Sequence, residues 1–387
     1  MNLTITPEQN VLRERLREFL TERYPLTTQV ETSQTVPGWR KDIWRAMGQE
    51  LGLLGLGIPA DRGGAGGGPG EIMTVMEELG NNLMPEPYLE SVVLAAGALR
   101  RLPGTMSSRA LQELVRGDAA YAVAWSEAGA RESLCHVSTK AKRDAQGWVL
   151  DGSKVAVVAA PWCDSMVVSA RTSGSINDPD GISLFLVPRG ASGVSLESFH
   201  TLDGRMAADL VLLGIQLPED ALLGTGSAAL SLMERVSDEA TTAMCASTVG
   251  SMEAMFQLST AFLKQRRQFG QSLSSFQVLQ HRVADMMMDI ELARSSVFGA
   301  VLHLNDDSDP EERAKAVSAA KVTVDRAARR VGQAAVQLHG GLGMNEATLV
   351  THYFRRVTVS GNRLGTADQH LARFARLESQ TAYELLD

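Results

Sequence analysis

Three long stretches in the second half of the chain have no proline in their interior and are rich in alanine, methionine and leucine. They span residues 227–267, 276–304 and 310–338. Helices of this length gain most of their stability in water by burying an apolar face against neighbouring elements. The sequence therefore predicts that residues 226–387 form a C-terminal four-helix bundle.

The first part of the chain also has a helical pattern. Thr6, Pro7 and Gln9 form a typical helix start, with threonine as the N-cap, proline at the first helical position and glutamine at the third. Leu16 and Leu20 then continue an apolar stripe at helical spacing. We expect residues 1–120 to form an N-terminal α-helical domain.

The region from 121 to 225 differs from both helical regions. It contains short β-rich runs, such as residues 182–188, which are separated by turn signals such as Asp151–Gly152. The runs follow one another too closely to leave room for crossover helices, which argues against a Rossmann unit. The expected fold class is α+β, with a small antiparallel β domain at 121–225 between the helical domain and the bundle.

Composition restricts the class of protein further. The net charge of -8 argues against nucleic-acid binding as the main activity. No run is apolar and long enough to span a bilayer. The three cysteines, Cys135, Cys163 and Cys245, have neither the spacing of a disulfide framework nor that of a metal site. We expect a cytoplasmic protein without a metal centre.

Two residues just after the first long helical stretch have side chains suited to a nucleotide ligand. Arg266 and Phe269 are three positions apart at the expected end of a helix, so both could face one ligand. A guanidinium matches the geometry of a pyrophosphate, and an aromatic ring can pack on adenine or ribose. The alternative is a surface arginine and a core phenylalanine.

A second group of residues could complete such a site. Gly340 and Gly341 follow the last long helical stretch and would let backbone N–H groups come close to an anion. Gln277 and Gln337 offer amide groups for hydroxyls of a ribose or ribityl chain. The alternative for the glycines is an ordinary turn at a helix C-terminus.

The segments KQRRQFGQSL, from residue 264, and QLHGGLGMNE, from residue 337, carry the patterns RxxFG and QxxGGxG. In this order, and with a β domain between two helical domains, the chain resembles the acyl-CoA dehydrogenase family of flavoproteins over almost its whole length. The resemblance implies FAD as cofactor and an acyl-CoA as substrate. It also implies electron-transfer flavoprotein as an electron acceptor. The matching cofactor contacts are Arg266, Phe269, Gln277, Gln337, Gly340, Gly341 and Ser126.

The base that the family uses is missing from its usual position. In the family a carboxylate removes the α-proton of the thioester, and the flavin takes the β-hydrogen as hydride. The segment NRLGTAD has Leu364 where the family has that glutamate. Some members place the base on the first bundle helix instead, where the matching residue is Ala240. Asp238 and Glu239 are adjacent, and Glu239 is a weak candidate for a displaced base.

A one-residue shift along a helix rotates a side chain by about 100 degrees, which would turn Glu239 away from the pocket unless the helix is offset. The alternative interpretation of Glu239 is a solvated acid near a helix N-terminus. The catalytic residue of this chain therefore stays unknown.

The β-domain segments also depart from the family pattern. Ser126 keeps a hydroxyl that could reach the flavin. Glu132 stands where a serine commonly contacts the pyrophosphate, and Ala156 and Val158 replace a tryptophan and a hydroxyl residue beside the flavin ring. In the family, the β domain and the base act on the subunit's own FAD. The segments matching Arg266 and its group reach the FAD of the neighbouring subunit.

The chain thus resembles the smaller subunits of α2β2 heteromeric acyl-CoA dehydrogenases, which act on bulky substrates such as steroid side chains. The main hypothesis is a subunit that completes the FAD site of a homologous partner, which carries the catalytic glutamate. A second hypothesis is a self-sufficient homo-oligomer that uses Glu239 or Asp238. A third is a non-enzymatic protein that binds acyl-CoA or flavin.

Overall fold

The computed structural model describes residues 6–35, 37–131 and 133–384. Its contacts divide the chain into two compact units. The first consists of Met1–Val30, Pro69–Met84 and Thr241–Asp387, and the second of Glu31–Gly68 and Pro85–Ala240. The division differs from the three predicted domains, whose boundaries stay a prediction. Among the described residues, no helix combines the length and the apolar character needed to cross a membrane.

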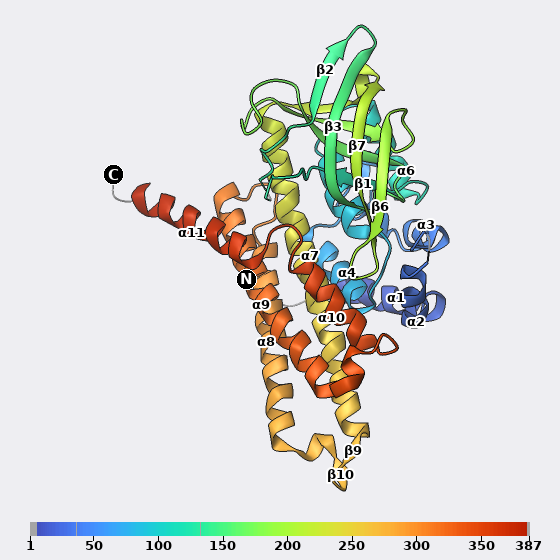
Figure 1. Ribbon diagram of the computed structural model, residues 1–387, viewed down its shortest axis with the longest axis vertical. Coiled ribbons are helices and arrows are strands. Elements are labelled where there is room, and N and C mark those ends of the chain that lie inside the picture. The colour runs from blue at the N-terminus through green and yellow to red at the C-terminus, as the bar shows by residue number, and fades with distance from the viewer. Residues whose placement is uncertain (1–5, 36, 132, 385–387) are drawn as a thin grey trace. The chain divides into compact units, whose positions relative to one another are not determined.

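The first unit is helical, as Figure 1 shows for the long yellow to red helices. Its helices are α1 (Pro7–Arg23), α4 (Pro69–Asn81), α8 (Gln277–Val301), α9 (Pro310–His339), α10 (Leu349–Ser360) and α11 (Ala367–Glu384), and α7 (Ser227–Gln265) enters it at Thr241. The short helix α2 (Leu26–Ser33) begins in this unit. The three predicted long helices are confirmed to within three residues at each end.

Capping groups explain where two of these helices begin. Thr6 and Gln9 form the predicted capping box at the start of α1, with Pro7 in its first turn. Asp309 caps α9, because its side chain accepts hydrogen bonds from the backbone N–H groups of Glu311 and Glu312. Both caps satisfy backbone donors that have no partner inside the helix.

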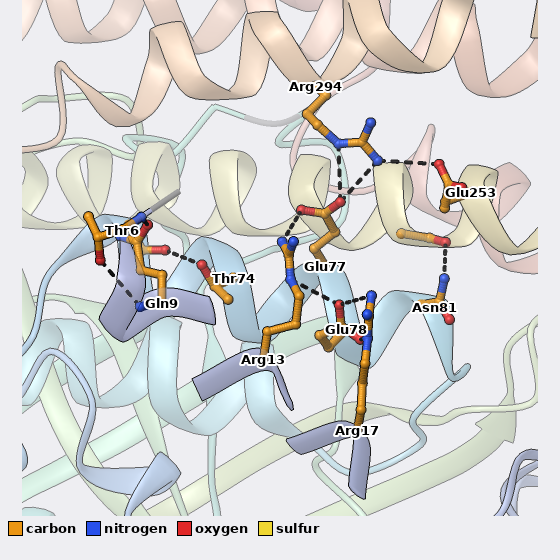
Figure 2. A network of polar contacts seen from close by, with 12 residues as sticks. Thr6, Gln9, Arg13, Arg17, Thr74, Glu77, Glu78, Asn81, Glu253 and Arg294 are labelled. Atoms are coloured by element: carbon orange, nitrogen blue, oxygen red, sulfur yellow. Dashed lines mark hydrogen bonds and ion pairs between the residues drawn. The ribbon is translucent and has the colours of Figure 1, made fainter. Parts of the chain in front are cut away.

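Ion pairs and close backbone contacts join α4 to its neighbours (Figure 2). Glu78 is buried and accepts hydrogen bonds from Arg17 of α1, at 2.7 and 2.8 Å. Glu77 accepts from Arg294 of α8, at 3.2 Å. A β-carbon on Gly250 of α7 would lie 1.9 Å from the carbonyl oxygen of Glu77, so only glycine permits this crossing. The glycine in the middle of α7 thus serves packing against α4.

The second unit contains an eight-stranded sheet in the order β6-β7-β3-β2-β4-β5-β8, with β1 paired to β4. The strands are β1 (Tyr121–Ala124), β2 (Lys140–Asp144), β3 (Gly147–Val158), β4 (Ser165–Arg171), β5 (Ile182–Pro188), β6 (Val194–His200), β7 (Met206–Leu217) and β8 (Leu222–Thr225). This unit also contains α3 (Lys41–Gln49), a π-helix (Leu89–Ala95), α5 (Ala96–Leu99), α6 (Thr105–Val115) and the first part of α7, up to Ala240.

The predicted antiparallel β domain is confirmed, with one addition. The hairpin-linked strands pair antiparallel, but β1 pairs with β4 in parallel, and β2 meets β4 in parallel at one residue pair. Parallel pairing is possible there because β2 and β3 lie between β1 and β4 in the sequence and replace a tight turn. Leu150, Phe185 and Leu210 belong to the buried core of this sheet.

Candidate functional site

A small hairpin at one end of the helical unit carries the first two predicted cofactor residues (Figure 1). Arg266 directly follows the last residue of α7, and Phe269 lies in the turn between β9 (Arg267–Gln268) and β10 (Gln271–Ser272). The prediction that both sit at a helix end is therefore wrong for Phe269, and the argument from helical spacing does not apply to the pair. Phe269 has a φ of 52° and is 89% exposed. An apolar ring displayed in this way suits contact with a ligand or another chain.

The other predicted cofactor residues lie at the ends of α8 and α9. Gln277 is the first residue of α8, and Gln337 lies in the last turn of α9; both are exposed. The rings of His339 and Phe262 stack at a centroid distance of 4.6 Å, which places the end of α9 beside the end of α7. Gln337 thus lies at the same end of the bundle as the C-terminus of α7.

Gly340 and Gly341 follow α9 and are exposed. Among the described residues, no heavy atom lies within 4 Å of where a β-carbon on either glycine would stand. The packing of the chain around them therefore leaves these positions open. Only Gly340, with a φ of 61°, needs glycine for its backbone conformation. The open space lets a ligand or a second chain approach the backbone closely.

These groups fit part of an FAD molecule by their chemistry. The guanidinium of Arg266 can donate to a pyrophosphate, and the amides of Gln277 and Gln337 can donate to hydroxyl groups or accept from them. All of these side chains are exposed. These side chains are therefore accessible to a ligand or to a second chain.

The β domain offers fewer groups to a flavin. Ser126 is exposed just after β1, and its carbonyl oxygen accepts a hydrogen bond from the backbone N–H of Val155, at 3.0 Å. Ala156 lies in a bulge of β3, with a φ of 52°, and its N–H donates to a carboxylate oxygen of Asp209 at 2.8 Å. Val158 supplies no hydroxyl. Of these predicted positions only Ser126 has a side chain that can hydrogen-bond a flavin, and Glu132 lies outside the described residues.

A buried ion pair between Glu127, which lies next to Ser126 in the sequence, and Lys154 was not predicted. The ammonium of Lys154 on β3 donates to Glu127 at 2.7 Å, and the side chains are 0% and 2% exposed. Ser138 and Thr139 also donate to Glu127 through their backbone N–H and hydroxyl groups. Two features of the sequence could have indicated the pair. Glu127 directly follows the candidate residue Ser126, and Lys154 lies within a run that is predicted to be a β-strand.

Opposing effects set the pKa values of this pair. Burial raises the pKa of Glu127, but the charge of Lys154 and the hydrogen bonds of Lys154, Ser138 and Thr139 outweigh it and lower the pKa to about 2. Burial lowers the pKa of Lys154 to about 8, although Glu127 counteracts this effect. Both groups are charged at neutral pH, so the pair joins the end of β1 to β3 electrostatically.

Leu364 lies in the loop between α10 and α11 and is half-buried. Its φ is 54°, in the left-handed region that a leucine rarely adopts. Its carbonyl oxygen accepts a hydrogen bond from Nε2 of His370 at 2.8 Å. A hydrocarbon side chain at this position can take up no proton, so residue 364 supplies no base.

The residue on α7 that the resemblance matches to an alternative base position, Ala240, is also apolar. Ala240 is fully buried, and the neighbouring Asp238 and Glu239 are 1% and 7% exposed. The expectation that Glu239 is a solvated acid is therefore wrong. Tertiary packing buries it beside Arg100 and Arg101, which follow the end of α5. The position of Glu239 on its own helix does not reveal these contacts.

Three guanidinium groups contact the carboxylate of Glu239. Arg101 donates to it at 2.6 and 3.1 Å, Arg100 at 2.9 Å and Arg235 at 3.3 Å. Both carboxylate oxygens thus accept charge-assisted hydrogen bonds. These contacts favour the interpretation that Glu239 is the counter-ion of the arginines and not a catalytic base. Its role as a displaced base stays a hypothesis.

Replacing Glu239 with glutamine separates these two roles. We expect the Glu239→Gln variant to lose about 1–3 kcal/mol of unfolding free energy, because the arginines lose their shared counter-charge. In a preparation that oxidises an acyl-CoA, turnover per folded molecule should stay within twofold. Thermal unfolding and steady-state kinetics measure the two effects, with Glu234→Gln on the same helix as control. Loss of turnover with unchanged stability would instead identify Glu239 as the base.

Comparison with known proteins shows the family of the chain. Models of the N-terminal, middle and C-terminal domains of acyl-CoA dehydrogenases match residues 6–102, 122–214 and 230–377. "Probable acyl-CoA dehydrogenase YngJ" of Bacillus subtilis is 30% identical over 351 residues, which cover 89% of this chain and 90% of that protein. Acryloyl-CoA reductase (NADH) of Anaerotignum propionicum is 28% identical, with 97% and 95% covered.

Two solved structures are similar over nearly the full chain. The ChsE4-ChsE5 complex from Mycobacterium tuberculosis matches with a TM-score of 0.87 and 27% identity, covering 98% of this chain and 99% of that chain. A variant of the Tcur3481-Tcur3483 "steroid ACAD" matches with a TM-score of 0.86 and 28% identity, covering 97% and 99%. The chain belongs to the acyl-CoA dehydrogenase family of FAD-dependent oxidoreductases.

Proposed function

We propose that this chain is a subunit of a heteromeric acyl-CoA dehydrogenase and completes the FAD site of a homologous partner. The observation that carries the proposal is Leu364, whose side chain cannot accept a proton at the position that the resemblance matches to the family's base. The predicted cofactor residues at the end of the helical bundle also support the proposal, because Arg266, Phe269 and Gln337 are exposed.

In this proposal each of the two chains contributes different groups to the active site. When bound, FAD would supply the hydride acceptor for the β-hydrogen of the acyl group. This chain contributes the guanidinium of Arg266 to the pyrophosphate, the ring of Phe269 to the adenosine and the amides of Gln277 and Gln337 to hydroxyl groups. Backbone N–H groups at Gly340 and Gly341 add donors. The partner contributes the glutamate that removes the α-proton.

The proposed substrate is an acyl-CoA with a bulky acyl group, such as a steroid side chain. The similarity to a protein described as a "steroid ACAD" supports this class. We further propose an electron-transfer flavoprotein as electron acceptor and the cytoplasm as location. Ala159 and Ala160 belong to the buried core of the sheet, so their small size serves tight packing and does not support room for a large acyl group.

Purification of the chain alone and together with a homologous chain that carries the glutamate tests the proposal. We expect the isolated chain to contain little flavin and to show no oxidation of acyl-CoA thioesters. The pair should bind about one FAD per two unlike chains and oxidise an acyl-CoA. A yellow homo-oligomer with one FAD per chain and full activity would overturn the proposal. So would acyl-CoA or flavin binding without flavin reduction when the partner is present.

A further inference from the structure

The loop between α10 and α11 stores backbone strain at Leu364. A residue with a β-carbon pays a steric penalty in the left-handed region, and the φ of Leu364 is 54°. Such a conformation persists only where surrounding contacts impose it, and it often marks a functional position. Leu364 itself contributes no catalytic group, so the reason for the strain has to lie in the contacts around it.

Helix α9 holds the beginning of this loop. Lys321 is fully buried, and its ammonium donates to the carbonyl oxygen of Ser360, the last residue of α10, at 2.8 Å. The same ammonium donates to Asp325, one turn further along α9, at 2.8 Å. Asp325 therefore balances the charge while Lys321 binds the end of α10 to α9.

His370 of α11 holds the strained residue itself. A carbonyl oxygen only accepts, so Nε2 of His370 must carry the hydrogen that it donates to Leu364 at 2.8 Å. Nδ1 lies 3.2 Å from the hydroxyl of Ser318 on α9, which can donate to it. Ser318 is fully buried and His370 is 6% exposed, so the ring orientation is set by packing and by this hydrogen bond.

Gly365 and Thr366, the next two residues of the loop, also take part in these contacts. A β-carbon on Gly365 would lie 2.8 Å from Nε2 of His370, so the imidazole reaches the Leu364 carbonyl only because residue 365 is glycine. The N–H of Thr366 donates to the side chain of Gln369 at 2.7 Å, and the N–H of Gln369 donates back to the Thr366 hydroxyl at 3.4 Å. This reciprocal cap fixes the start of α11.

We propose that Ser318, Lys321 and His370 are positioning residues that impose the left-handed conformation on residue 364. They hold the loop in one geometry from both ends, whichever side chain residue 364 carries. The loop backbone then keeps the conformation in which residue 364 would present a base. Only the side chain at this position lacks a proton acceptor. The inference does not depend on whether the chain pairs with an unlike partner.

A pair of substitutions at residue 364 tests the imposed geometry. Alanine normally gives a more stable protein than glycine, but at an imposed positive φ this order reverses. We expect Leu364→Gly to have a folding equilibrium constant about fivefold higher than Leu364→Ala, measured by urea unfolding of the full chain. In a His370→Phe background the advantage of glycine should disappear or reverse. An alanine variant at least as stable as the glycine variant in the wild-type background would overturn the proposal.

Hydrogen exchange provides a readout that remains informative if a variant is too unstable for unfolding curves. We expect His370→Phe to speed exchange in residues 361–366 at least tenfold, with little change in the sheet of the other unit. His370→Gln, which retains a side-chain donor, should restore part of the protection. His352→Phe on α10 is the matched control. Equal exchange at 361–366 in wild type and His370→Phe would show that His370 does not hold the loop.

Discussion

The Glu127→Gln variant is expected to lose about 3–5 kcal/mol of unfolding free energy at pH 7, the cost of leaving a buried charge without its partner. Lys154 is fully buried, and Glu127 is its only carboxylate contact that the structure gives among the described residues. Glutamine keeps the size of the side chain but removes the negative charge. Its amide group also places a donor against the donors of Ser138 and Thr139. Urea unfolding followed by circular dichroism measures the loss.

The double variant Glu127→Gln/Lys154→Met is the matched control. It removes both charges, so we expect it to be less destabilised than the sum of the two single variants, by several kcal/mol. Additive losses would show that the two side chains contribute independently and would contradict the ion pair as the cause.

The pH dependence of this effect has a definite direction. Because the pKa of Glu127 in the folded chain is about 2, below its ordinary value of 4.5, the folded state binds fewer protons than the unfolded state between these values. The stability that the carboxylate contributes is complete above pH 4.5 and is lost as the pH falls towards 2. The difference between wild type and Glu127→Gln should shrink over that window.

The second large expected effect is on FAD binding at the end of the helical bundle, where Arg266 lies. In the assembled enzyme, Arg266→Ala is expected to weaken FAD binding by about 10- to 100-fold, because a charge-assisted hydrogen bond to the pyrophosphate is lost. Flavin content after gel filtration and equilibrium titration with FAD measure the change. The stability of the isolated chain should hardly move, since Arg266 is exposed.

Arg267 gives a control in the same hairpin. It is also exposed, and its guanidinium donates to the carbonyl oxygen of Gly270 at 3.3 Å. We expect Arg267→Ala to leave FAD affinity within twofold of wild type, as its charge is similar and only its position differs. Equal losses in both variants would indicate general electrostatic attraction and would contradict a specific role for Arg266.

The sequence was sufficient to predict elements whose signals are local. The capping box of Thr6 and Gln9, the start of α9 at Pro310 and the lengths of the long helices depend on neighbouring residues, and all are confirmed. The hairpin turn at Phe269 was not predicted, because the pattern RxxFG by itself is compatible with a helix end as well as a tight turn. Its φ of 52° belongs to a hairpin turn.

The site residues depended more strongly on contacts between distant segments. Glu239 has an ordinary position on α7, and only packing brings Arg100 and Arg101 to its carboxylate, more than 130 residues away in sequence. Lys154 on β3 and Glu127 in the loop after β1 are likewise paired. Neither periodicity nor composition reveals such pairs, because they depend on register and on the way one element covers another.

The sequence by itself determined the family resemblance, the order of helical and β regions and the absence of a carboxylate at residue 364. These follow from residue identity and local pattern. Only the tertiary structure decided that Glu239 is buried among arginines and that Leu364 has a left-handed backbone held by His370. The reason is physical: burial, ion pairing and backbone strain arise from segments far apart in sequence, and they exist only once those segments are packed together.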